Sequence, residues 1–104
     1  MAGTHRIGIV GAGHWSRRLV KGIESHPFEV HKTVDVLSYD QKETLLKDIG
    51  IQRDRHYRID PEDPLPDDFF EGIDVVQVAS PVEYHLSQTR EALDRGKFVV
   101  TEKS

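Results

Sequence analysis

The sequence contains no cysteine, one tryptophan and no long apolar run among its 104 residues. Without cysteine the chain forms neither a disulfide framework nor a thiolate metal site or nucleophile, and a cytoplasmic location is the expectation. No apolar stretch approaches the roughly 20 residues of a membrane helix, and the first apolar run, at 7–10, is far shorter than the core of a signal peptide. We therefore expect a soluble protein with no membrane partner.

A strong excess of one charge is also missing. The chain has 14 Lys and Arg against 18 Asp and Glu, a net charge of −4. This weak acidity argues against nucleic acid as a partner, because proteins that bind nucleic acid need a basic surface. At this length folding buries roughly 65% of the extended-chain surface, which is enough for one modest core. We predict one domain spanning residues 1–104.

Short β-branched runs alternate with longer amphipathic stretches along the whole chain. In the first amphipathic stretch, Trp15, Leu19 and Ile23 recur on one helical face. The run around Val75 and Val76 is almost continuously apolar, as in a strand that is covered on both faces. The predicted strands are residues 6–10, 30–37, 57–59, 74–79 and 98–101.

Residues that start and stop helices stand between these strands. Asp40 and Glu43 have the spacing of a capping box, and Gly50 lies where the second helix must end. Pro81 stands where the last helix can begin, and Gly96 stands where it can stop. Between them apolar residues recur at helical spacing, with Leu86, Thr89 and Leu93 on the predicted inner side. Strands joined by helices of this length lie parallel with right-handed crossovers.

The fold class predicted from this alternation is α/β, a doubly wound parallel sheet of five strands in the order 3-2-1-4-5, which is Rossmann-like. In such a sheet ligands bind at the carboxyl ends of the strands, between strands one and four. The loops after Val10, Ala79 and Thr101 are therefore expected to converge on one crevice.

The segment 11–16 matches the pattern GxGxxG at two of its three glycines, directly after a strand and before a helix. Gly11 permits the tight turn, and Gly13 lets a pyrophosphate approach the backbone at the helix N-terminus. Ser16 takes the place of the third glycine. The alternative is a glycine turn that binds no ligand.

An acid about 20 residues beyond such glycines binds the ribose 2′-hydroxyl of NAD. We place the end of strand two at Ser38 and explain Asp40 as the helix cap, so that Ser38 takes the ribose position. A hydroxyl there does not repel a 2′-phosphate, and we expect NADP(H) to bind at least comparably with NAD(H). Lys42 is either a source of charge for that phosphate or an ordinary solvated helix residue.

The six histidines form no HxxxH or HxH pair, and no metal site is predicted. A further set of motifs follows the later strands. Ala79, Ser80 and Pro81 precede His85 by a few residues, and a Gly-Lys-x-Val-x-x-Glu-Lys run spans 96–103.

Together with the glycine loop, these motifs resemble the N-terminal NAD(P)-binding domain of the Gfo/Idh/MocA oxidoreductases, over nearly the whole chain. The resemblance implies NAD or NADP as cofactor and places Ser38 at the adenosine ribose. It also implies that Lys103, at the nicotinamide end, is the catalytic residue. The cofactor contacts that it implies are Gly11, Gly13, His14, Trp15, Ser38, Ser80, Pro81, His85, Glu102 and Lys103.

Two features depart from the family pattern. Ser104 replaces the proline that usually follows the family lysine. The substrate-binding domain, with its acid and base residues, is absent, so the chain is expected to be a fragment or truncated form of a longer protein. On its own it is expected to show no dehydrogenase turnover.

The leading hypothesis is the nucleotide-binding domain of an NAD(P)-dependent oxidoreductase that acts on a sugar or sugar-like alcohol. One alternative is a non-catalytic dinucleotide-binding module. Another is an S-adenosylmethionine-dependent methyltransferase domain, which has a similar glycine loop but gives no role to Glu102 and Lys103. The expected partners are a nicotinamide dinucleotide and a sugar-like substrate, with a homo-oligomer left open.

Overall fold

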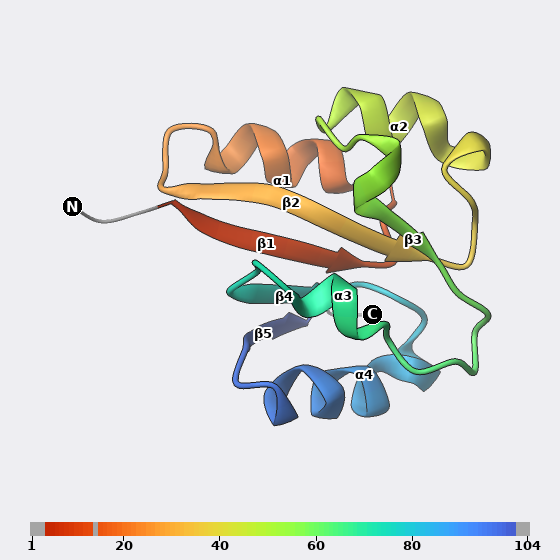
Figure 1. Ribbon diagram of the computed structural model, residues 1–104. Helices are drawn as coiled ribbons and strands as arrows, with labels where there is room; N and C mark the ends of the chain where they lie inside the picture. Colours follow the sequence, from red (N-terminus) through yellow and green to blue (C-terminus); the bar gives the residue numbers. More distant parts are fainter. Residues whose placement is uncertain (1–3, 14, 102–104) are drawn as a thin grey trace.

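The computed structural model describes residues 4–13 and 15–101. Its centre is one parallel sheet of five strands in the order β3-β2-β1-β4-β5 (Figure 1). The elements are β1 (His5–Val10), α1 (Trp15–Ile23), β2 (Phe28–Asp35), the 3-10 turn η1 (Asp40–Lys42), α2 (Glu43–Asp48), the 3-10 turn η2 (Arg53–Arg55), β3 (His56–Arg58), α3 (Asp67–Phe70), β4 (Val75–Val78), α4 (Val82–Asp94) and β5 (Phe98–Thr101). The predicted fold and strand order are confirmed.

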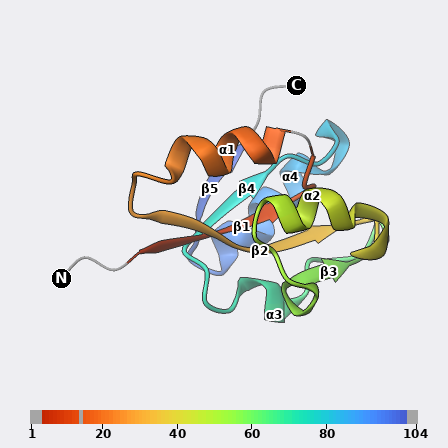
Figure 2. The same cartoon turned by 90° about the horizontal axis from the view of Figure 1, so that it is seen from above.

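Helices cover both faces of the sheet, which gives three layers. Figure 2 shows α1 and α2 in front of the sheet and α4 behind it. A buried cluster that includes Ile9 and Leu46 fills the space on the side of α1 and α2. A second cluster, which includes Phe69, Val76 and Ala92, fills the space on the side of α3 and α4. Each face of the sheet therefore has its own core.

The two glycines expected to end helices do so. Gly50 follows α2 and Gly96 follows α4, with φ of +79° and +72°. After α4 the amide N–H groups of Gly96 and Lys97 donate to the carbonyl oxygens of Leu93 and Ala92. This pairing satisfies carbonyls that the helix itself leaves free.

The prediction for the end of strand two is wrong. β2 ends at Asp35, and the chain turns away there, so Ser38 lies three residues beyond the strand. The apolar residues Val36 and Leu37 extended the sequence pattern past the strand, but both side chains are exposed. They belong to the loop, so the apolar run extends two residues beyond the end of the strand.

The capping prediction is also wrong. Asp40 makes no capping hydrogen bond; its Oδ1 accepts from Arg53 Nη2 at 2.7 Å, and this guanidinium lowers the pKa of the Asp40 carboxyl. The reciprocal cap is made two residues earlier. Gln41 N donates to Ser38 Oγ at 3.3 Å, and Ser38 N donates to Gln41 Oε1 at 2.9 Å. Ser38 therefore starts this helical segment.

The apolar spacing located α4 but not its buried side. Gln88 and Ala92 are the buried residues of the helix, whereas Leu86 and Leu93 are exposed. Phe98, on the edge strand β5, is 77% exposed. Among the helices of the described ranges, none is both long and apolar enough to cross a membrane.

Candidate functional site

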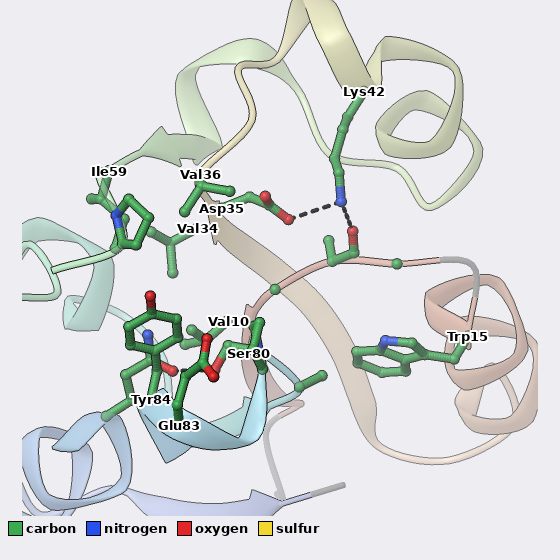
Figure 3. A pocket seen from close by; sticks show the side chains of 17 residues that line it. Val10, Trp15, Val34, Asp35, Val36, Lys42, Ile59, Ser80, Glu83 and Tyr84 are labelled. Atoms are coloured by element: carbon green, nitrogen blue, oxygen red, sulfur yellow. Dashed lines mark hydrogen bonds and ion pairs between the residues drawn. The ribbon is translucent and has the colours of Figure 1, made fainter. Parts of the chain in front are cut away.

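A cavity of about 560 Å³ opens at the carboxyl ends of β1, β2 and β4 (Figure 3). It lies where the strand order reverses, the position at which open α/β sheets bind ligands. Loops after all three strands contribute to its walls, and so does the first turn of α4. The lining residues are Val10, Gly11, Ala12, Gly13, Trp15, Val34, Asp35, Val36, Lys42, Ile59, Pro61, Ala79, Ser80, Pro81, Glu83, Tyr84 and Gln88.

The floor of the crevice is the glycine loop. Gly11 has φ of +83°, and its N–H donates to the Val34 carbonyl at 2.9 Å. On the other side, the Val10 carbonyl accepts from Ala79 N at 2.8 Å. A Cβ on Gly11 would lie 2.8 Å from the backbone N of Ser80. The ends of the three strands thus meet around a position that only glycine fits.

Gly13 and Trp15 form the wall on the side of α1. A Cβ on Gly13 would lie 3.3 Å from Cδ1 and Nε1 of the Trp15 indole, so the ring folds back over the loop. Trp15 also packs against the buried cluster beneath α1 and α2. It is therefore both a packing residue and a crevice residue. His14, predicted to contact the pyrophosphate, lies outside the described residues.

Ser16 holds the third position of the glycine pattern. Its side chain is completely buried, and its N–H donates to the Gly13 carbonyl at 2.9 Å. Within the described ranges its Oγ has no hydrogen-bond partner. The hydroxyl thus adds a buried polar atom where the common pattern has no side chain at all.

Replacing Ser16 by Ala is expected to raise the free energy of unfolding by about 1 kcal/mol. The substitution removes an unsatisfied hydroxyl, whose burial costs about 1–3 kcal/mol, and keeps the Cβ that packs below the loop. Urea denaturation of both chains measures the difference. A less stable Ser16→Ala chain would show that the hydroxyl has a partner in solution.

Asp35 and Lys42 form a pair on the other side of the loop, drawn with dashed lines in Figure 3. Asp35 Oδ2 accepts from Lys42 Nζ at 2.8 Å, and Asp35 Oδ1 accepts from Leu37 N at 3.0 Å. Lys42 Nζ also donates to the Ala12 carbonyl of the glycine loop. The two side chains are only 8% and 17% exposed. Lys42 is therefore not an ordinary solvated helix residue.

Asp35 is the crevice acid that sequence reasoning missed. In the parallel register of β1 and β2, Val10 is level with Val34, so Asp35 stands directly beside Gly11. Ser38 was expected there, but it does not line the crevice. The overlooked signal is the carboxylate itself, because it interrupts the apolar run 30–37 and comes about 20 residues after the glycines.

The loop after β4 faces Asp35 across the crevice. Ser80 and Pro81 both line it, whereas His85 does not. His85 Nε2 donates instead to the Ser80 carbonyl, and Ser80 Oγ donates to Gln88 Oε1. His85 and Gln88 thus fix the turn that carries Ser80.

His56 on β3 supports the loop after β2. Burial lowers the pKa of His56, so the ring is neutral at pH 7. Its Nε2 lies 2.9 Å from the Leu37 carbonyl and must carry the proton, which leaves Nδ1 to accept from the Thr33 hydroxyl at 2.7 Å. The ring therefore holds the backbone of Leu37, whose N–H donates to the Asp35 carboxylate.

This arrangement fits a ligand with three kinds of group. The glycine loop and the helix N-terminus that follows it suit an anion, Asp35 suits hydroxyls, and the apolar side chains of Val36 and Ile59 suit a flat ring. A dinucleotide combines all three. Among the residues described, no three His, Asp or Glu side chains group as they would around a metal ion. Glu102 and Lys103 lie outside those residues.

Residues 5–103 match the sequence model of a protein family that is described as an oxidoreductase family with an NAD-binding Rossmann fold. No curated protein sequence matches the chain. Among solved structures, scyllo-inositol dehydrogenase from Lactobacillus casei, with bound NAD(H) and scyllo-inositol, is 28% identical, with a TM-score of 0.71. The match covers 96% of this chain and 28% of that one.

Two other solved structures share the fold. Aldose-aldose oxidoreductase from Caulobacter crescentus, complexed with glycerol, is 21% identical with a TM-score of 0.71, and the match covers 96% of this chain and 30% of that one. UDP-N-acetylglucosamine 3-dehydrogenase from Acidithiobacillus ferrooxidans is 17% identical with a TM-score of 0.70, and the match covers 99% of this chain and 30% of that one. The chain thus spans at most 30% of the length of these three structures.

Proposed function

Because the chain belongs to the Gfo/Idh/MocA family of oxidoreductases, as an NAD-binding Rossmann domain, we propose that the crevice described above is its cofactor site. The observation that carries the proposal is the meeting of Gly11 and Asp35 at the ends of adjacent strands. The glycine turn leaves room for a pyrophosphate, and the carboxylate accepts hydrogen bonds from ribose hydroxyls.

The other predicted contacts receive roles by position. Gly13 and Trp15 line the crevice beside the start of α1, where we propose that the pyrophosphate binds, and Ser80 and Pro81 form the opposite wall. His85 is a positioning residue, since it bonds to the Ser80 carbonyl. The ribose role that was expected of Ser38 passes to Asp35. For His14, Glu102 and Lys103, the roles at the pyrophosphate and at the nicotinamide remain proposals that rest on family resemblance.

We propose that the protein transfers hydride between the nicotinamide and a sugar or sugar-like alcohol. The support is the family and the neighbour that holds NAD(H) together with scyllo-inositol. NADP(H) is a second cofactor that we propose for the same crevice, because Asp35 is paired with a lysine.

Titration of the 104-residue chain with NADH, followed by its fluorescence, tests the site. Gly13→Val is expected to weaken NADH binding at least about tenfold, or about 1.4 kcal/mol, because a side chain here keeps the pyrophosphate from the loop backbone and pushes against the Trp15 ring that forms the wall. Gly22→Val is the matched control, since a Cβ at Gly22 meets nothing within 4 Å. It is expected to bind like the parent.

A folded Gly13→Val chain that binds NADH as tightly as the parent would contradict the proposed site. S-adenosylmethionine serves as the competing ligand in the same titration. Binding of S-adenosylmethionine without NADH would favour the methyltransferase alternative and overturn the cofactor proposal.

A further inference from the structure

Resting on the proposed function, we propose that Lys42 determines cofactor selectivity, and that the Asp35–Lys42 pair makes the ribose end of the crevice accept a 2′-phosphate as well as a 2′-hydroxyl. The crevice would then bind NADPH and NADH with dissociation constants within about tenfold of each other. A lone carboxylate at this place would favour NADH strongly.

The position of the ammonium group carries the inference. Lys42 Nζ lies 2.8 Å from Asp35 Oδ2 and donates also to the Ala12 carbonyl, so it stands between the ribose acid and the glycine loop. These two bonds use two of its three N–H donors. We assign the third to a ligand oxygen at the same edge of the crevice.

The backbone that carries Lys42 is fixed. The reciprocal bonds between Ser38 and Gln41 start the turn, and Lys42 N donates to the carbonyl oxygens of Ser38 and Tyr39 at 3.2 and 3.0 Å. The ammonium group of Lys42 is therefore held at one place beside the crevice. The side chain is 17% exposed, which limits the screening of its charge by solvent.

The chemistry of the two cofactors explains the effect. A 2′-hydroxyl donates to a carboxylate, whereas a 2′-phosphate carries about two negative charges and is repelled by one. With Lys42 in contact, the carboxylate of Asp35 is neutralised as a pair and keeps free lone pairs for the hydroxyl. The ammonium attracts the phosphate, so one pair serves both groups.

The experiment measures the ratio of the dissociation constants for NADPH and NADH in four chains. Lys42→Met is expected to raise the ratio at least tenfold, through weaker NADPH binding. Asp35→Asn is expected to lower it, because the repulsion disappears. The matched control is Lys47→Met, on α2, which removes the same charge from an exposed lysine paired with Glu43 at 3.4 Å. It is expected to leave the ratio unchanged.

Three outcomes decide the inference. Equal shifts in Lys42→Met and Lys47→Met would overturn it, as would dissociation constants of the parent for NADPH and NADH that differ by more than about tenfold. If Lys42→Met does not fold, Lys42→Arg keeps the charge and is expected to retain the parent ratio within threefold, and a tenfold change there would also overturn it. If the parent chain binds neither NADH nor NADPH, the result contradicts the proposed function. This outcome is distinct from those that contradict the role of Lys42.

Discussion

Replacing Gly11 by Ala is expected to lower the free energy of unfolding by about 2–5 kcal/mol. An L-residue with φ of +83° carries roughly 1–2 kcal/mol of strain. The added Cβ would also lie 2.8 and 2.9 Å from N and Cα of Ser80, and 3.0 Å from C of Ala79. These are backbone atoms that cannot rotate away, and overpacking of this kind costs about 1–3 kcal/mol.

Gly50→Ala is the matched control for the clash. Gly50 has nearly the same φ, +79°, but a Cβ there meets nothing within 4 Å. It is expected to show the strain alone, about 1–2 kcal/mol. Urea denaturation of the two variants measures the difference. Equal losses would show that the loops after β1 and β4 are not held in contact.

The same clash has a consequence for binding. Ala79 and Ser80 must move to admit a Cβ at Gly11, and both line the crevice. The first glycine of the loop therefore shapes two walls of the site at once, its own and that of the neighbouring strand. The sequence pattern assigns this glycine only a tight turn; the contact across to β4 becomes visible only in the folded sheet.

The fold could be predicted because its signals are local and repeated. Each strand and helix is marked by its own apolar pattern, and Gly50 and Gly96 end helices through a backbone preference that does not depend on distant residues. Parallel connection then follows from the alternation alone. These features need no knowledge of which side chains touch.

The ribose end of the site could not be predicted as securely, because it depends on where one strand stops. Val36 and Leu37 look like strand residues, but they lie in the loop and are exposed. The sequence pattern therefore places Asp35 within the strand and puts the end of the strand at Ser38. The register with β1, which places Asp35 beside Gly11, is a property of the paired strands. A one-dimensional pattern does not contain it.

The buried side of α4 illustrates a second limit. Gln88 and Ala92 face inward, whereas Leu86 and Leu93 are exposed, so hydrophobicity points to the wrong side of this helix. Gln88 is buried because its side chain accepts a hydrogen bond from Ser80 Oγ at the crevice. Gln88 is a polar residue at a core position because it holds Ser80 in place, and a search for apolar periodicity does not detect such a residue.

Replacing Phe69 by Ala is expected to lower the free energy of unfolding by about 3–5 kcal/mol, a large share of the stability of a domain this size. The Phe69 ring is fully buried and makes edge contacts with Tyr57 and Phe70, at centroid distances of 6.3 and 5.4 Å. It also fills the space that Gly8 leaves open on β1, where a Cβ would lie 2.7 Å from Cζ of the ring.

The residue Phe98 provides the control, because it has the same side chain and is 77% exposed. Phe98→Ala is expected to change the free energy of unfolding by no more than about 0.5 kcal/mol. Gly8→Ala distinguishes lost packing from a general loss of apolar area. A Cβ there would lie 2.5 Å from Cδ1 of Ile73 as well as 2.7 Å from the Phe69 ring. Gly8→Ala is expected to cost less in the Phe69→Ala chain than in the parent, because the ring contact has gone and the Ile73 side chain can move into the space that the ring leaves. Similar costs in both backgrounds would mean that Phe69 does not rest on β1 as described.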